Sequence, residues 1–72
     1  MRKITGYSID EDKKLVTLCT EELENGATFN ASFQLKENKE ETWTSPEYVS
    51  LAKTMILDSR CIMSMIVNNH FM

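Results

Sequence analysis

The sequence predicts an α+β fold, in which a three-stranded antiparallel β-meander is followed by one long C-terminal helix packed on one sheet face. Two observations predict it: strand-like alternation of apolar and polar residues in the first half, and a helical period in the second half. With 72 residues, the chain has room for a single small domain spanning 1–72. The expected elements are strands at about 3–10, 15–24 and 27–36 and a helix at about 46–68.

The strand at 27–36 has the clearest pattern. Its apolar residues alternate with polar ones, which is the period of a strand with one buried face; they are Ala27, Phe29, Ala31, Phe33 and Leu35. Asn25-Gly26 precedes the strand, and this dipeptide is a strong signal for a tight hairpin turn. A two-residue turn would place Leu18 opposite Phe33 and Val16 opposite Leu35, so that the apolar residues share one face.

The first hairpin is expected to turn around Asp10–Lys13. The simplest register then pairs Tyr7 with Val16, which adds Tyr7 and Ile9 to the apolar face. Ile4 would meet Cys19 on the other, mostly polar face, which we expect to be exposed to water.

The second half of the chain begins with a helix start signal. Ser45 can cap the helix, Pro46 fits its first position, and Glu47 complements the helix dipole. No glycine or proline interrupts the helical period that follows Glu47. The segment before the helix, Lys36–Glu41, is expected to be a solvated loop. One face of the helix collects Tyr48, Ala52, Met55, Ile56, Ser59, Ile62, Met63 and Ile66. The alternative is a shorter helix ending near Ser59, with a fourth strand at 61–67.

Composition argues against several classes of protein. The net charge of -3 is unlike that of a typical nucleic-acid binder, which is usually basic. No apolar run approaches the roughly 18 residues that a membrane helix needs. We therefore expect no membrane contact, and the composition disfavours a nucleic-acid partner. The start of the chain does not resemble a secretory signal, which predicts a cytoplasmic protein with Cys19 and Cys61 as reduced thiols.

Residues for catalysis, metal or cofactor binding are scarce. His70 is the only histidine and lies near the end of the chain, so no Ser-His-Asp or Cys-His arrangement can be argued. Gly6 and Gly26 are the only glycines, which excludes a glycine-rich phosphate loop. A chain this short also leaves hardly any room for a ligand pocket. The prediction is a protein that is not an enzyme and has no cofactor and no metal.

Three residues depart from the amphipathic pattern. Leu57, Cys61 and Met65 follow the spacing i, i+4, i+8 and form a second apolar stripe on the expected helix. A sheet covers only one side of a helix, so this stripe predicts contact with another protein, either a target or a second copy. A homodimer would close around a two-fold axis near Cys61. Trp43 and Tyr48 are further candidate partner-binding residues, with closure of the core near the helix start as the other interpretation.

These features predict a small non-enzymatic protein-binding regulator or inhibitor of a larger protein. A phage or mobile-element accessory protein would fit this description. One alternative is a dimeric nucleic-acid-binding protein, which would gather Arg2, Lys3, Lys13 and Lys14 from two chains. The other is a structural subunit, whose helix stripe would be permanently buried in a larger assembly.

Overall fold

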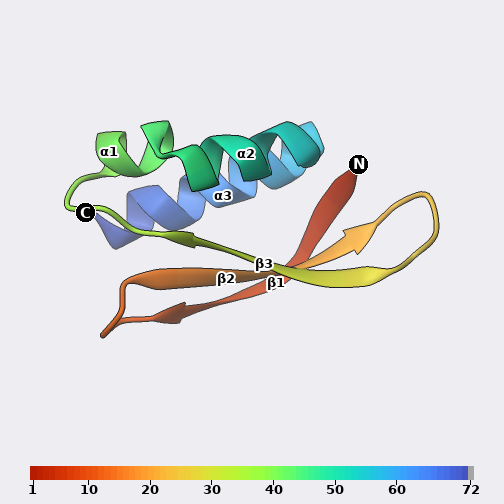
Figure 1. Ribbon diagram of the computed structural model, residues 1–72, viewed down its shortest axis with the longest axis horizontal. Helices are drawn as coiled ribbons and strands as arrows, with labels where there is room; N and C mark the ends of the chain where they lie inside the picture. The colour runs from red at the N-terminus through yellow and green to blue at the C-terminus, as the bar shows by residue number, and fades with distance from the viewer. Residues whose placement is uncertain (72) are drawn as a thin grey trace.

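The computed structural model describes residues 1–71 and confirms the α+β fold. A three-stranded antiparallel sheet of order β1-β2-β3 is followed by helices, of which the last is the longest. The helices lie together on one side of the sheet (Figure 1). The elements are β1 (Arg2–Asp10), β2 (Leu15–Glu22), β3 (Thr28–Gln34), α1 (Lys39–Thr44), α2 (Pro46–Thr54) and α3 (Leu57–His70).

The hairpin of β2 and β3 differs from the prediction by two residues in register. Val16 lies opposite Phe33, and Leu18 lies opposite Ala31. The reason is a longer turn: the backbone N–H of Glu22 donates to the carbonyl of Ala27, and Gly26 has a φ of 72° within the turn. A two-residue shift leaves every side chain on its predicted face, so the apolar face is still the one that the alternation indicated.

The hairpin of β1 and β2 contains a β-bulge that the sequence analysis did not predict. Tyr7 pairs with Leu18, Ile9 pairs with Val16, and the register shifts between Ile4 and Gly6. The extra residue brings Ile4 onto the same face as Tyr7 and Ile9. The prediction that Ile4 lies on the polar face was therefore wrong, and Ile4 packs against the core.

The single helix predicted for 46–68 is interrupted. α2 ends at Thr54, and Met55 and Ile56 have extended backbone before α3 begins. Met55 forms a parallel bridge with Arg2, and the backbone N–H of Ile56 donates to the carbonyl of Arg2 at 3.0 Å. This contact with β1 replaces helical hydrogen bonds and lets the chain reverse. The alternative strand at 61–67 was also wrong, because these residues belong to α3.

A short helix, α1, occupies part of the segment predicted to be a loop. The side chain of Asn38 caps it by accepting a hydrogen bond from the backbone N–H of Glu41 at 2.8 Å. Thr42 is buried, and its hydroxyl accepts a hydrogen bond from the backbone N–H of Lys36. The predicted start of α2 is confirmed, since Ser45 caps it and Pro46 occupies its first turn.

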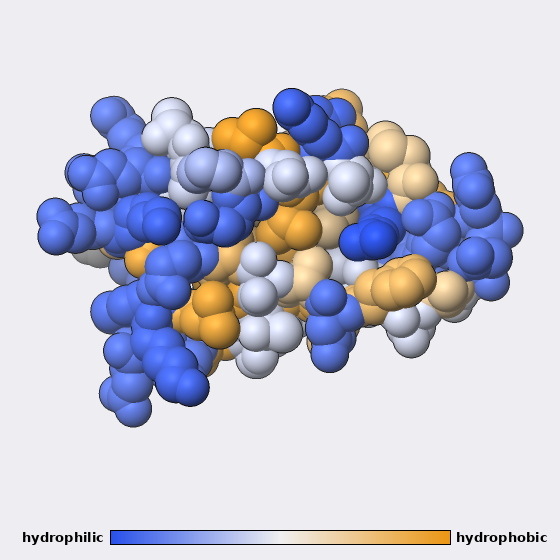
Figure 2. Space-filling model, viewed as in Figure 1, coloured by the Kyte–Doolittle hydropathy of each residue, from blue (hydrophilic) through white to orange (hydrophobic). Residues whose placement is uncertain are grey.

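The core lies between the sheet and the helices, with α2 over β3 and α3 over β1. Hydrophilic residues gather at both ends of the long axis of the molecule (Figure 2). Within residues 1–71, no helix combines the length and the apolar character needed to cross a membrane. The buried hydrophobic residues are Val16, Leu18, Phe33, Leu35, Tyr48, Met55, Met63, Ile66 and Val67.

Candidate protein-binding surface

The outer side of α3 carries an aligned set of exposed side chains, Leu57, Cys61 and Met65, which we call the outer stripe. Leu57 is 67% exposed and Met65 is 59% exposed, and Cys61 between them is exposed as well. The opposite side of α3 is buried against the sheet and includes Met63 and Val67. The helix is thus apolar on two sides, and the domain itself covers only one of them.

Polar residues border the outer stripe. At about 100° per residue, Asp58 lies on one side of the stripe, whereas Arg60 and Ser64 lie on the other. Asp58 and Arg60 are exposed and of opposite sign, so neither sign of charge dominates the border. An apolar centre with a polar rim is the usual arrangement of a protein–protein contact.

Tyr48 does not contribute to an exposed surface. Its side chain is only 8% exposed and packs edge-on against Phe33, with ring centroids 5.3 Å apart. Its hydroxyl lies 3.2 Å from the hydroxyl oxygen of Ser64. Tyr48 therefore joins α2 to both β3 and α3, which is the position that the core interpretation of this residue expects.

Trp43 lies at the end of α1 and is partly buried against the core. Its indole Nε1 is buried, and no hydrogen-bond partner for it is present within residues 1–71. Trp43 and Tyr48 thus lie apart from the outer stripe. They pack against the core near the start of α2, whereas the outer stripe is exposed to water.

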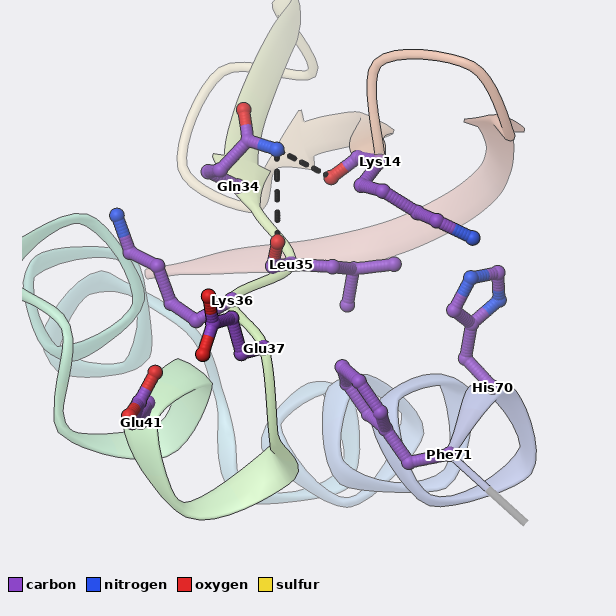
Figure 3. A pocket seen from close by; sticks show the side chains of 8 residues that line it. All are labelled: Lys14, Gln34, Leu35, Lys36, Glu37, Glu41, His70 and Phe71. Atoms are coloured by element: carbon purple, nitrogen blue, oxygen red, sulfur yellow. Dashed lines mark hydrogen bonds between the residues drawn. The ribbon is translucent and has the colours of Figure 1, made fainter.

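A hollow of about 670 Å³ opens where the end of β3 meets the end of α3 (Figure 3). This volume lies within the range of small-molecule sites, roughly 300–1,000 Å³, so the expectation of hardly any room for a pocket was wrong. The sequence did not reveal it because the walls come from distant segments. They are Lys14, Gln34, Leu35, Lys36, Glu37, Glu41, His70 and Phe71.

The charged groups around the hollow largely offset one another. Glu11 lies 3.7 Å from the ammonium of Lys14 and 3.5 Å from Nε2 of His70. Lys36 is 3.7 Å from the carboxylate of Glu47. The amide of Gln34 donates to backbone carbonyls, including that of Lys14. The hollow therefore carries charges of both signs, and the amide of Gln34 is already hydrogen-bonded to the backbone. These features do not favour one class of ligand.

Among residues 1–71, no three His, Cys, Asp or Glu side chains are grouped so that they could hold a metal ion. Comparison of the chain with protein-family models, with curated proteins and with solved structures gave no match. The function is therefore inferred from the residues of the chain itself.

Proposed function

We propose that the chain is a small non-enzymatic protein-binding module that regulates or inhibits a larger protein, and that the outer stripe of α3 is its contact surface. The observation that supports this function is the alignment of Leu57, Cys61 and Met65 on the solvent side of a helix whose other side is buried. A continuous apolar stripe, unlike a single exposed apolar residue, favours a role in binding.

The partner surface that fits the stripe best is an apolar groove on a larger protein. Anchors at i, i+4 and i+8 are the pattern by which a helix fills such a groove, and the flexible side chain of Met65 adapts to its walls. Flat pairing of two such stripes would bury little more than three side chains from each copy. A stable interface buries about 800 Å² from each partner, so a groove that also reaches Asp58 and Arg60 is favoured over a dimer of α3.

The expected contribution of the stripe can be estimated. Full burial of a leucine or methionine side chain contributes about 1.5–3 kcal/mol. Replacing both Leu57 and Met65 by glutamate should therefore weaken partner binding by about a hundredfold or more. The fold should survive, because both side chains already face water.

A capture experiment tests this function. The tagged chain and two variants are exposed to lysate of the source cells, with and without nuclease treatment, and retained proteins are identified by mass spectrometry. Leu57→Glu/Met65→Glu should lose a near-stoichiometric partner that the wild-type chain retains. Leu23→Glu is the matched control, because Leu23 is 50% exposed but lies beside the turn between β2 and β3. Calorimetry with the purified partner then measures the loss in affinity.

The other outcomes separate the alternatives. A partner bound equally well by Leu57→Glu/Met65→Glu would show that the outer stripe is not the contact surface. Partners that disappear on nuclease treatment would favour the nucleic-acid-binding alternative. An isolated wild-type chain that unfolds or aggregates would favour a structural subunit.

A further inference from the structure

β3 forms an edge of the sheet that lacks the usual protection. Within residues 1–71, its only neighbouring strand is β2, and their pairing contains no bulge. The run from Asn25 to Leu35, which includes all of β3, has no charged residue and no proline. Natural proteins usually protect an edge strand with charges, proline, bulges or a covering segment, because its free backbone groups can pair with another chain.

The opposite edge, formed by β1, is protected. A bulge interrupts it between Ile4 and Gly6. The carbonyl of Arg2 accepts a hydrogen bond from the backbone N–H of Ile56, and the backbone N–H of Ile4 donates to the hydroxyl of Ser59 at 2.9 Å. Ile56, before α3, and Ser59, in the first turn of α3, thus cover the first part of the β1 edge, whereas no comparable contact covers β3 within residues 1–71.

The backbone groups that β3 leaves open can be identified. The N–H of Leu35 donates to the carbonyl of Lys14, and the N–H of Glu22 donates to the carbonyl of Ala27. Because bonded residues alternate along an antiparallel strand, the odd-numbered residues of β3 bond to β2. The backbone groups of the even-numbered residues point to the open edge. These residues are Thr28, Asn30, Ser32 and Gln34.

We propose that β3 pairs with β3 of a second copy of this chain, antiparallel, about a two-fold axis at Ala31. This register uses the whole strand and forms hydrogen bonds only between even-numbered residues. Asn30 then lies opposite Ser32 of the second copy, and Phe29 lies opposite Phe33. The two sheets join into one continuous six-stranded sheet.

The side chains of β3 match themselves in this register. On the face toward the helices, Phe29 is 45% exposed and would lie beside the strand position of Phe33 in the second copy, whose side chain is already buried within its own chain. On the other face, the exposed side chains of Asn30 and Ser32 would lie opposite each other, and an amide opposite a hydroxyl can form a hydrogen bond. Each chain has a net charge of -3, yet the uncharged edge lets two copies meet without like charges in contact.

α2 covers one end of β3 and not the other. Tyr48 of α2 packs on Phe33, toward one end of β3, whereas Met55, just after α2, already bridges to Arg2 in β1. α2 therefore crosses from β3 toward β1 and leaves Phe29 half exposed, with the guanidinium carbon of Arg2 4.8 Å from the centre of its ring. The two-fold axis places the end of β3 that α2 covers in one copy beside the half-exposed Phe29 of the other.

The proposed dimer is closed and leaves the outer stripe accessible. Both outer edges of the six-stranded sheet would be β1 edges, so no β3 edge would remain for a further copy to pair with. α3 lies over β1, away from the joined edge. The dimer would thus present two outer stripes, and its formation does not depend on the function proposed for them.

Sedimentation of charge variants tests the dimer. The wild-type chain should sediment with twice its mass of 8.3 kDa. Asn30→Lys/Ser32→Lys sets like charges opposite each other and should weaken the dimer by about tenfold or more. Asn30→Lys/Ser32→Glu carries the same number of substitutions but pairs opposite charges, and it should restore the dimer. Leu57→Glu/Met65→Glu should remain dimeric, which distinguishes pairing through β3 from pairing through α3.

Disulfide trapping tests the register. In a background of Cys19→Ser/Cys61→Ser, Ala31→Cys should form a linked dimer under mild oxidation. Residues opposite each other in a pair without hydrogen bonds have Cα atoms about 4.5 Å apart, which suits a disulfide. Thr28→Cys is the matched control, because position 28 would face position 34 and not itself.

The proposal is overturned by any of three results. The first is a wild-type chain that stays monomeric up to millimolar concentration. The second is a dimer that Leu57→Glu/Met65→Glu dissociates but Asn30→Lys/Ser32→Lys does not. The third is linkage of Thr28→Cys that is as fast as that of Ala31→Cys. Circular dichroism checks that each variant is folded, and if the lysine variant unfolds, the trapping experiment decides.

Discussion

The hydroxyl oxygen of Ser59 lies 2.9 Å from the backbone nitrogen of Ile4 and accepts its hydrogen bond, which joins the first turn of α3 to the outer edge of β1. Ser59 is only 2% exposed, although it is polar and lies on the helix side that faces the sheet. Its hydroxyl satisfies a backbone group at the edge of the sheet that would otherwise be left without a partner.

Removing this hydroxyl should destabilise the domain. Ser59→Ala leaves the partly buried N–H of Ile4 without an acceptor, and we expect a loss of about 1–3 kcal/mol in the free energy of unfolding. Urea denaturation measures the loss. Ser50→Ala in α2 is the matched control, because Ser50 is exposed and alanine favours a helix. Equal stability of wild type and Ser59→Ala would show that this hydrogen bond contributes nothing.

Two methionines on α3 test the orientation of the helix. Met63 is fully buried, whereas Met65 is 59% exposed. Met63→Ala should lower the free energy of unfolding by about 2–5 kcal/mol, because it leaves a cavity in the core. Met65→Ala should change it by no more than about 0.5 kcal/mol. Thermal or urea denaturation compares the two, and a larger loss for Met65→Ala would contradict the placement of the outer stripe toward solvent.

Glu22 should make the stability depend on pH in the acid range. Its carboxylate accepts a hydrogen bond from the amino group of Met1 at 3.0 Å, and this contact is the main reason that its pKa is lowered from the ordinary value of 4.5. The backbone N–H of Glu24 and the charge of Arg2 lower the pKa further. Since the folded state binds this proton more weakly than the unfolded state, the stabilisation is present above pH 4.5 and decreases as pH falls through the lowered pKa.

Denaturation at a series of pH values checks this prediction. Glu22→Gln should be less stable than wild type near neutral pH, and the difference should shrink as the pH falls below 4.5. Glu24→Gln is the control: its exposed side chain is not the acceptor, so the wild-type pH dependence should remain. A difference between Glu22→Gln and wild type that stays constant across this range would contradict the assignment.

Local patterns determined the faces of β3 and α3. The alternation from Ala27 to Leu35 identified the buried face of β3, and the spacing of Leu57, Cys61 and Met65 identified the exposed side of α3. Both follow from the backbone geometry of a single element, because side chains repeat every second residue in a strand and about every 3.6 residues in a helix. The cap at Ser45 was equally readable, since it depends only on its immediate neighbours.

Contacts between distant segments decided the strand register, the break between α2 and α3, and the open edge of the sheet. A register shifted by two residues keeps the same faces, so the alternation could not choose between pairing Phe33 with Leu18 and pairing it with Val16. The break at Met55 and Ile56 depends on Arg2, which is remote in sequence, and no helical period reports it. The open edge of β3 is likewise a property of the whole sheet. The sequence by itself therefore determined the faces of β3 and α3. The tertiary structure decided the register, the bulge that changes the face of Ile4, the helix break and the edge, because each depends on hydrogen bonds between distant segments.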